Sequence, residues 1–218
     1  MDRWKFYNKE KCIGKGSFGS AHLVKCTVNQ RLYVIKSIEL PSKEADKARC
    51  LEEIKILQAC RHINVIRYKE CFLEPASADN PGLIINIVME FADAGDLGNH
   101  IKRQKEEKKT HFEEKEVRNW LVQLTLALRY LHTKVRVLHR DIKSHNIFMT
   151  SNNLLKLGDF GISKLLSADN DFASTQIGTP LNICPEMVSG QSYDFKSDIW
   201  SLGCVTYELC SLKPAFQG

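Results

Sequence analysis

The sequence predicts an α+β fold with two lobes: a small β-rich N-terminal lobe that contains one helix, and a mainly helical C-terminal lobe. Three observations indicate this division. In roughly the first ninety residues, short apolar runs alternate with turn-forming residues, which is typical of strands. One segment there, residues 45–60, has helical periodicity instead. After a polar, glycine-containing link at residues 92–96, apolar residues recur with the period of an amphipathic helix.

The N-terminal strands are predicted from their apolar runs. Residues 23–24 and 32–35 flank a polar turn, which predicts a β-hairpin. Further strands are expected at residues 65–68 and 83–89. Between these two, the turn-forming residues of segment 75–82 predict a surface loop.

The helix at residues 45–60 is predicted from its spacing of apolar residues. Leu51, Ile54 and Leu57 recur every three residues and so lie on one side, whereas charged residues occupy the other side. We expect the apolar side to pack against the strands. The N-terminal lobe is therefore placed at residues 1–91.

The C-terminal lobe is placed at residues 92–218, where helical patterns replace strands. Segment 102–116 carries charges of both signs and is expected to form a solvated helix end and loop. A longer amphipathic helix should follow, because apolar residues recur there on a single face. That face consists of Val117, Trp120, Leu121, Leu124, Leu128 and Leu131.

Composition and charge exclude several classes of function. The net charge of +5 arises from basic residues interleaved with acidic ones, so no nucleic-acid-binding stripe is expected. The eight cysteines form no CxxC pair, which predicts reduced, intracellular cysteines. The N-terminus lacks the apolar core of a signal peptide, and no apolar run is long enough to span a bilayer. We therefore expect a soluble, cytoplasmic or nuclear protein that binds neither membranes nor nucleic acid.

Residues 14–19 form a GxGxxG pattern, which on its own has two interpretations. In a dinucleotide-binding fold such a loop opens a helix. Here residues 21–25 are typical of a strand, which favours a glycine-rich β-hairpin whose backbone N–H groups approach phosphate oxygens. The chain has no Walker-type GxxxxGKS or GxxxxGKT pattern. The candidate phosphate-binding residues are Gly14, Lys15, Gly16, Ser17, Phe18 and Gly19.

Lys36 ends an apolar run that follows the glycine loop. An isolated lysine there would simply be an exposed residue at a strand end. Beside a phosphate loop, its ammonium group can bind α- and β-phosphate oxygens if a carboxylate holds it in position. Glu53 on the predicted helix can supply that carboxylate, with Leu57 packed one turn behind it. Glu52 is the competing candidate; Glu53 is preferred because it borders the apolar side of the helix.

Two patterns, HRDxKxxN and then DFG, carry the candidate catalytic residues. Phosphoryl transfer needs a metal ion that neutralises phosphate charge and a carboxylate that orients the attacking hydroxyl and takes its proton. Asp141 is the candidate carboxylate, and Lys143 can contact the γ-phosphate. Asn146 and Asp159 offer the hard oxygen ligands that suit Mg²⁺. Each residue alone is equally typical of a loop or turn, so the interpretation depends on their joint occurrence.

This set of patterns resembles the eukaryotic protein kinases, and Lys143 is typical of their serine/threonine type. Within them, the chain is similar to the NIMA-related (NEK) kinases. The similar segments are residues 34–36, 87–91, 95–97, 139–143, 159–162, 177–180 and 196–203. The resemblance implies the bilobal kinase fold, ATP and Mg²⁺ as cofactors, and protein substrates with serine or threonine acceptors. It also implies locations at the cytoskeleton, centrosome, cilium or nucleus.

The same resemblance assigns the residues around the adenine of ATP. The hinge would be Glu90, Phe91 and Ala92, whose backbone would bind adenine, and Met89 would be the gatekeeper. The ATP-binding set is completed by Ala21 and Val34.

Residues 161–186 form a segment rich in Ser, Thr and Asp that is expected to be regulatory. In kinases with an arginine beside the catalytic aspartate, as Arg140 is here, a phosphorylated residue of this segment pairs with that arginine. Thr175 is the best-placed acceptor, ahead of Ser174, and Thr179 belongs to the same regulatory set. By family resemblance, Ile162 indicates a preference for threonine acceptors.

Two departures from the family pattern bear on function. Leu181 and Asn182 stand where the family usually has two aromatic residues, which leaves the acceptor specificity open. The chain also ends at Gly218, so a C-terminal lobe without its last helices is expected, and Glu186 would lack the arginine with which it usually pairs.

Two hypotheses of function follow from the sequence. The first is an active kinase that transfers the γ-phosphoryl group of MgATP to Ser or Thr hydroxyls of protein substrates, regulated by proteins that bind outside this segment. The alternative is a truncated kinase fragment that binds ATP, is inactive, and acts as an interaction scaffold. A dinucleotide-binding oxidoreductase is excluded, because the glycine loop is not followed by a helical pattern.

Overall fold

The computed structural model describes residues 3–16, 19–76, 82–159, 182, 184–190 and 192–216, without the side chains of Arg49 and Glu53. The chain divides into two compact units. Among the described residues, the first unit comprises those up to Arg61 together with Ile66–Phe91. The second comprises His62–Val65 and the residues from Ala92 onward.

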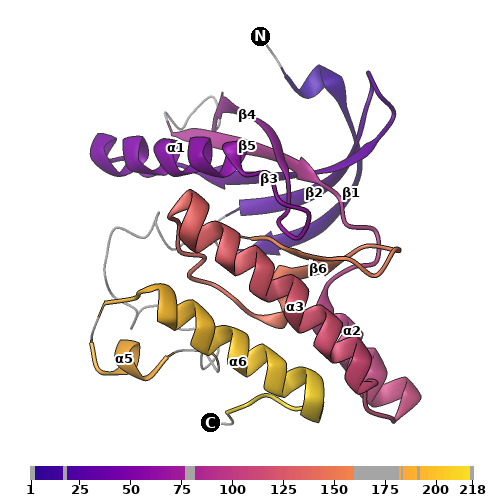
Figure 1. Cartoon of the computed structure of the whole chain (residues 1–218). Helices are drawn as coiled ribbons and strands as arrows, with labels where there is room; N and C mark the ends of the chain where they lie inside the picture. Colours follow the sequence, from indigo (N-terminus) through magenta and orange to yellow (C-terminus); the bar gives the residue numbers. More distant parts are fainter. Residues whose placement is uncertain are drawn as a thin grey trace. The chain divides into compact units, whose positions relative to one another are not determined.

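The first unit is built on a five-stranded antiparallel sheet with the strand order β1-β2-β3-β5-β4 (Figure 1). A single 3₁₀ turn, η1 (Trp4–Phe6), precedes it. The strands are β1 (Tyr7–Gly16), β2 (Gly19–Cys26), β3 (Leu32–Glu39), β4 (Tyr68–Pro75) and β5 (Leu83–Glu90).

The β2–β3 hairpin and β5 confirm two of the sequence predictions, whereas the strand expected at residues 65–68 was wrong. Val65 forms only an isolated bridge with Leu157, and β4 begins at Tyr68 and runs to Pro75. The short apolar run suggested a strand, but its first residue, Val65, belongs to the second unit, whereas the residues from Ile66 onward belong to the first. The paired strand β4 instead begins at the buried Tyr68 and continues through more polar residues that are half-buried or exposed.

The helix of the first unit, α1 (Glu44–Ala59), agrees with the predicted segment to within one residue at each end. Ile54 and Leu57 are almost completely buried, which confirms the apolar side predicted from their spacing. Burial of each such side chain contributes about 1.5–3 kcal/mol relative to exposure.

A cluster of buried side chains joins β1, β2, β3 and β5. It consists of Tyr7, Val24, Cys26, Ile35 and Val88, with Trp4, Phe6, Tyr33 and Phe72 packed against it. The rings of Trp4 and Phe72 meet edge to face, with their centroids 5.7 Å apart. The residues before β1 thus close one side of this cluster.

The second unit is mainly helical, and its helices α3 and α6 pack side by side (Figure 1). Its helical elements are α2 (Leu97–Arg103), the π-helical turn η2 (Gln104–Lys108), α3 (Glu114–Tyr130), a second such turn η3 (Leu131–Val135), the 3₁₀ turn η4 (Ser144–Asn146), α5 (Pro185–Val188) and α6 (Phe195–Ser211). A two-stranded sheet is formed by β6 (Ile147–Met149) and β7 (Leu155–Leu157). As predicted, segment 102–116 is a helix end and loop whose side chains are exposed apart from a few such as Gln104 and Phe112.

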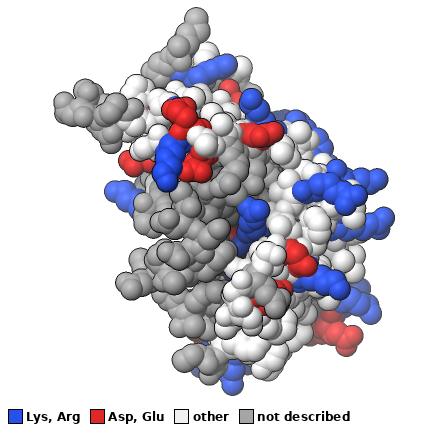
Figure 2. Space-filling view, turned by 90° about the vertical axis from the view of Figure 1, so that its left-hand side faces the viewer, with Lys and Arg blue, Asp and Glu red and all other residues white. Residues whose placement is uncertain are grey.

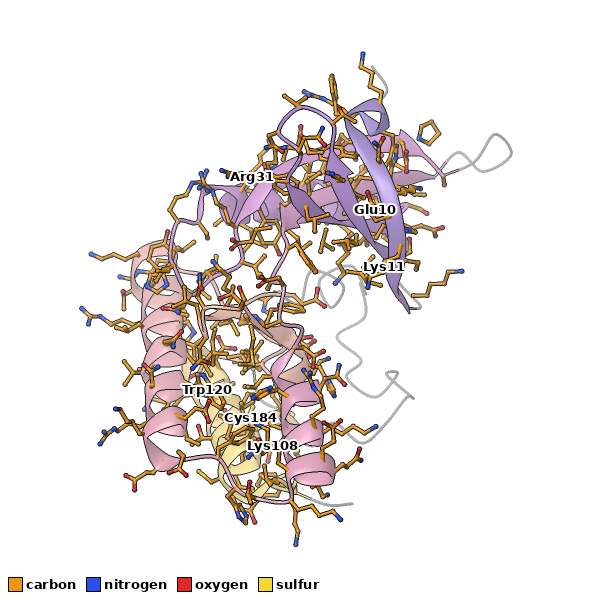
Figure 3. The ribbon with its side chains drawn as sticks, turned by 90° about the vertical axis from the view of Figure 1, so that its right-hand side faces the viewer. Glu10, Lys11, Arg31, Lys108, Trp120 and Cys184 are labelled. Atoms are coloured by element: carbon orange, nitrogen blue, oxygen red, sulfur yellow. The ribbon has the colours of Figure 1, made fainter. Side chains whose placement is uncertain are left out.

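Trp120 anchors α3 within this unit. Its fully buried ring lies edge-on to His100 of α2 and to Phe112, and Figure 3 shows it directed from α3 toward α2. Its indole N–H donates to Asn153 Oδ1 at 3.0 Å, so the polar atom of the buried ring is satisfied. Most of the predicted apolar face of α3 is buried in the same way, although Leu121 is only partly buried.

The start of α6 is fixed by a capping box. The Asp194 side chain accepts from the backbone N–H of Ser197, and the Ser197 hydroxyl accepts from the backbone N–H of Asp194. This cap sets the first turn of the helix and therefore the position of Asp198, the next residue.

The described surface carries both charge signs. On the face shown in Figure 2, Lys and Arg side chains are interspersed with Asp and Glu side chains. Within the described ranges, none of the helices is long and apolar enough to cross a membrane.

Candidate active site

The catalytic loop between α3 and β6 brings together three of the predicted residues. Asn146 Nδ2 donates to both the backbone oxygen and Oδ2 of Asp141, each at 2.7 Å. Lys143 Nζ lies 2.9 Å from the same Oδ2 atom. An amide and an ammonium group therefore converge on one carboxylate oxygen, which orients the carboxylate and stabilises its charge.

His139 ties this loop to the segment that precedes Asp159. The backbone N–H of Asp141 donates to His139 Nδ1 at 3.3 Å, so the ring proton resides on Nε2, which faces the carbonyl oxygen of Gly158 at 3.0 Å. Complete burial lowers the pKa of His139, which keeps the ring neutral near pH 7. The neutral imidazole thus connects the backbone of Asp141 to that of Gly158 through its two ring nitrogens.

Asn146 and Asp159, the predicted metal ligands, belong to adjoining segments. The backbone N–H of Gly158 donates to the carbonyl oxygen of Asn146 at 3.0 Å. Because Asn146 uses its amide nitrogen on Asp141, its Oδ1 atom is directed away from that carboxylate and can accept a cation. Asp159 adopts a left-handed backbone conformation with φ of 56°.

The donor set fits Mg²⁺. In the part of the chain that the structure describes, no group of three or more His, Cys, Asp or Glu side chains could hold a metal ion. A site made from one carboxylate and one amide oxygen suits a cation that keeps several water ligands and also binds phosphate oxygens, as Mg²⁺ does.

Asp198 of α6, which was not among the predicted site residues, holds the catalytic loop in place. Its buried carboxylate accepts the backbone N–H of His139 on Oδ2 at 2.9 Å and that of Arg140 on Oδ1 at 3.0 Å. His132 Nε2 lies 2.7 Å from Oδ2, and the Tyr193 hydroxyl donates to Oδ1 at 2.5 Å. Four hydrogen bonds thus compensate for the burial of this charge.

These bonds determine the ionisation of Asp198. Burial alone would raise its pKa, but the hydrogen bonds from His132, Tyr193 and the backbone of His139 outweigh burial and lower it. The carboxylate therefore stays ionised near neutral pH. The sequence carried a signal for Asp198, because it lies in segment 196–203 of the family resemblance, but its role as an anchor depends on burial and contacts.

Asp96 and His145 form a second contact of the loop that the sequence did not indicate. Asp96 Oδ1 caps α2 by accepting the backbone N–H of Asn99 at 2.9 Å, and His145 Nδ1 lies 2.9 Å from the same oxygen. A Cβ on Gly98 would lie 2.5 Å from the His145 ring, so a larger residue there would displace the ring from this position. This contact fixes α2 against the residue before Asn146.

The first unit carries the predicted phosphate-binding hairpin. β1 and β2 pair in antiparallel register up to Gly16 and Gly19, so the loop joins two strands and does not open a helix. Gly19 is required by packing, because its φ is 144° and a Cβ would lie 1.8 Å from the Ser37 carbonyl oxygen. Gly14 has room for a Cβ, so the fold alone does not explain that glycine. Ser17 and Phe18 lie outside the described residues.

Lys36 lies on β3, paired with Ala21 of β2 and Ile87 of β5. The helix α1 carries Glu53, whose side chain is not described, whereas the competing Glu52 is exposed. The preference for Glu53 therefore remains a prediction.

The residues predicted to contact adenine are arranged around β3 and the end of β5. Val34 pairs with Met89, and Met89 is largely buried. Glu90 exchanges two hydrogen bonds with Arg67: its backbone N–H donates to the Arg67 carbonyl, and its Oε1 accepts the Arg67 N–H at 2.8 Å. Ala92, the first residue of the link in the second unit, is buried.

The segment at residues 161–186 is described only in part. The proposed regulatory residues Thr175 and Thr179 lie outside the described residues, as does Ile162. Asn182, one of the two departures from the family pattern, donates through Nδ2 to the Ile142 carbonyl at 3.3 Å. Its own carbonyl accepts from the Ser201 hydroxyl at 3.1 Å. Asn182 thus joins the catalytic loop to α6 through polar contacts.

Glu186, which the sequence leaves without its usual arginine, has another partner in the structure. Glu186 is only partly buried, and its Oε1 accepts the Ser197 hydroxyl at 2.8 Å. A hydrogen bond from its own backbone N–H, with that from Ser197, lowers the pKa of Glu186. Its charge is therefore stabilised by neutral donors.

Comparison with known proteins identifies the class. The protein kinase domain family matches residues 7–218, so the chain belongs to that family. Its curated relatives include three NEK kinases: "Serine/threonine-protein kinase Nek1" of Mus musculus, "Serine/threonine-protein kinase Nek3" of Mus musculus, and "Probable serine/threonine-protein kinase nek3" of Dictyostelium discoideum. The identities are 44%, 43% and 42%, each over 97% of this chain. The aligned part is 17%, 39% and 18% of the respective relative, so the chain spans less than half of each.

The ionised state of Asp198 predicts how stability depends on pH. Because its pKa is lowered in the folded state, its contribution is present above the ordinary aspartate pKa and is lost as the pH falls through the folded value. We expect the Asp198→Asn variant to be about 1–3 kcal/mol less stable than the wild type at pH 7. The difference should shrink as the pH falls toward 3, which urea unfolding at a series of pH values can measure.

The matched control is Glu106→Gln, which removes one exposed charge in η2. It should leave the unfolding free energy within about 0.5 kcal/mol of the wild type at every pH. An Asp198→Asn penalty that is constant from pH 7 to 3 would mean that the carboxylate charge does not carry the stabilisation.

Proposed function

We propose that the chain transfers the γ-phosphoryl group of MgATP to Ser or Thr hydroxyls of protein substrates, as a NEK-like kinase. The observation that carries the proposal is the convergence of Lys143 and Asn146 on Asp141 Oδ2. Membership of the protein kinase family and the NEK relatives support it.

Asp141 would act on the acceptor hydroxyl. The hydroxyl oxygen attacks the γ-phosphorus, the bond to the ADP oxygen breaks, and the hydroxyl proton passes to the Asp141 carboxylate. Asn146 holds that carboxylate in position, and Lys143 offsets the negative charge of the γ-phosphate and of Asp141. His139 keeps the loop in this geometry through its backbone contact with Asp141.

Asn146 and Asp159 would hold Mg²⁺, which neutralises phosphate charge when it is bound. The amide orientation of Asn146 supports this role, because the hydrogen bonds to Asp141 leave its oxygen for the cation. The buried His139 contacts the carbonyl of Gly158, and the N–H of Gly158 donates to the carbonyl of Asn146. These two contacts hold the residue before Asp159 next to Asn146.

The N-terminal lobe, which we assign to residues 1–91, would bind the remainder of ATP, and residues 92–218 would supply the catalytic loop. Lys36 would bind the α- and β-phosphates with Glu53 as its counter-charge. Gly14 would allow the backbone of the hairpin to approach the phosphates, which would explain a glycine that packing does not require. The other phosphate-loop residues are Lys15, Gly16, Ser17, Phe18 and Gly19, and those around adenine are Ala21, Val34, Met89, Glu90 and Ala92.

Regulation would act through the segment that follows Asp159. We assign Thr175 as the phosphorylated residue that pairs with Arg140, and Thr179 to the same set. A location in the cytoplasm, and regulatory partners that bind outside this segment, follow from the family resemblance.

The direct test of activity is transfer of labelled phosphate from MgATP to a generic protein substrate. We expect Asp141→Asn and Asp159→Asn each to lower kcat by about 10²–10⁴-fold, because one removes the proton acceptor and the other a metal-binding charge. Glu106→Gln is the control and should retain wild-type activity. Signal that is equal in the wild type and both site variants would reject the enzyme and leave the ATP-binding scaffold, which a MgATP-dependent shift in Tm would then support.

The regulatory assignment has its own test. Thr175→Ala should lower the activity of the phosphorylated protein, because position 175 can then no longer carry the phosphate group that would pair with Arg140. Ser174→Ala, one residue away, should have little effect. If Thr175→Ala retains full activity while Ser174→Ala loses it, the acceptor is Ser174 and the assignment is wrong.

A further inference from the structure

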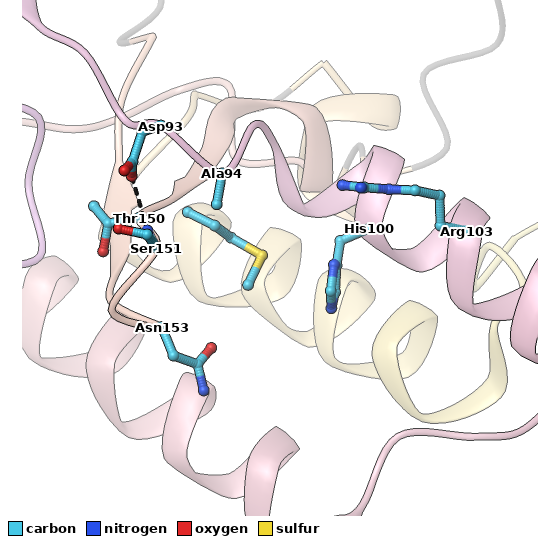
Figure 4. A pocket seen from close by; sticks show the side chains of 8 residues that line it. Asp93, Ala94, His100, Arg103, Thr150, Ser151 and Asn153 are labelled. Carbon is cyan, nitrogen blue, oxygen red and sulfur yellow. Dashed lines mark hydrogen bonds between the residues drawn. The ribbon is translucent and has the colours of Figure 1, made fainter.

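A depression on the second unit lies apart from the catalytic loop. It is formed by the link before α2, by α2 itself and by the turn between β6 and β7 (Figure 4). Its volume of about 420 Å³ falls within the roughly 300–1,000 Å³ of ligand-binding pockets. The lining residues are Asp93, Ala94, His100, Arg103, Met149, Thr150, Ser151 and Asn153.

The frame of the depression is held by backbone hydrogen bonds. The N–H of Ala94 donates to the Met149 carbonyl at 2.9 Å, and the N–H of Met149 donates to the Gly95 carbonyl at 2.7 Å. The N–H of Asn153 donates to the Thr150 carbonyl at 2.9 Å, which closes the β6–β7 turn. The link and the turn therefore form one fixed edge, so the depression is preformed.

The floor is apolar and aromatic. Met149 is buried and Ala94 is partly buried, and both line the depression. His100 stacks on Phe112 with the ring centroids 5.4 Å apart. Burial, with the positive charges of Arg103 and Lys108, lowers the pKa of His100, so its ring is neutral at pH 7. The floor can thus accept an aliphatic side chain.

The two charged residues lie at opposite ends of the depression (Figure 4). At one end, Asp93 Oδ1 accepts the backbone N–H of Ser151 at 2.8 Å, and this bond lowers the pKa of Asp93 and keeps it ionised. At the other end, Arg103 is exposed, and among the described residues its guanidinium makes only a long contact of 3.5 Å with the Asn99 carbonyl and no ion pair. Its terminal N–H groups can therefore bind a carboxylate.

The surroundings of Arg103 favour an acidic ligand. The end of α2 and the turn η2 carry an excess of basic over acidic residues. The basic residues are Lys102, Arg103, Lys105, Lys108 and Lys109, and the acidic ones are Glu106 and Glu107. Such a surface attracts acidic chains and repels basic ones.

We infer that this depression is a docking site for an acidic linear segment of a protein substrate, which binds there away from its phosphoacceptor. An aliphatic side chain of the segment lies on Met149 and Ala94, and a glutamate or aspartate of the segment pairs with Arg103. Asp93 at the opposite end fixes the direction of the segment, because it favours an N–H donor and repels a second carboxylate. The inference rests on the proposed kinase function only in naming the ligand as a substrate.

Binding is tested without ATP, so that its result does not depend on catalysis. The probe is a fluorescein-labelled twelve-residue peptide of alternating leucine and glutamate, measured by fluorescence anisotropy against the 218-residue protein. Arg103→Glu should weaken binding at least tenfold. The matched control Arg118→Glu makes the same charge change at an exposed position of α3, outside the depression, and should change affinity less than threefold. A peptide with glutamine in place of glutamate should bind at least tenfold more weakly.

A second variant tests the apolar floor without changing charge. Ala94→Trp should fill the depression and abolish binding, with an unchanged Tm as evidence that the protein remains folded. Equal losses for Arg103→Glu and Arg118→Glu, no loss for Ala94→Trp, or equal binding of the glutamine peptide would each overturn the docking site.

A kinetic experiment tests whether protein substrates bind at the depression. The same acidic segment, fused to a phosphoacceptor peptide, should lower KM with kcat unchanged, and Arg103→Glu should remove that advantage. Absence of phosphorylation together with specific peptide binding would reject the proposed kinase function and leave the docking site. Phosphorylation with no effect of the fused segment would reject its use for substrates.

Discussion

The buried carboxylate of Asp198 is the interaction on which the candidate active site depends. It accepts the backbone N–H groups of His139 and Arg140, the two residues before Asp141. Arg140 has a φ of 66°, a left-handed conformation that costs on the order of 1–3 kcal/mol for a residue other than glycine. Two hydrogen bonds to a charged group offset this cost, each worth about 1.5–3 kcal/mol. The turn that presents Asp141 is therefore set by α6 before any ligand binds.

The contacts around Asp198 extend this order to the rest of the site. The capping box at Asp194 sets the start of α6, and His132 joins the carboxylate to the end of α3. From the loop, His139 reaches the carbonyl of Gly158 and so couples Asp141, the proposed proton acceptor, to the segment of Asp159, the proposed metal ligand. One buried charge thus organises groups that are far apart in the sequence, which is consistent with a site that acts mainly by positioning and electrostatics.

The sequence predicted those features that repeat with a period or form a pattern. The spacing of Ile54 and Leu57 located α1, and the glycine loop followed by a strand predicted the β1–β2 hairpin. The joint occurrence of the HRDxKxxN and DFG patterns predicted a group of residues around Asp141. The structure brings the side chains of Lys143 and Asn146 onto its carboxylate. The role of Asp198 could not be predicted from spacing, because it depends on burial and on backbone donors from a distant segment. The strand at residues 65–68 failed for a related reason, since a short apolar run does not specify its partner.

The most direct test of this account is amide hydrogen exchange at His139 and Arg140 in the protein without nucleotide. If Asp198 holds the loop, both amides should exchange at least about 100-fold more slowly than those of the exposed loop residues Thr110 and His111. The protection should be lost in Asp198→Ala while the amides within α3 remain protected. Exchange of His139 and Arg140 at the rate of the exposed loop in the wild-type protein would contradict the account.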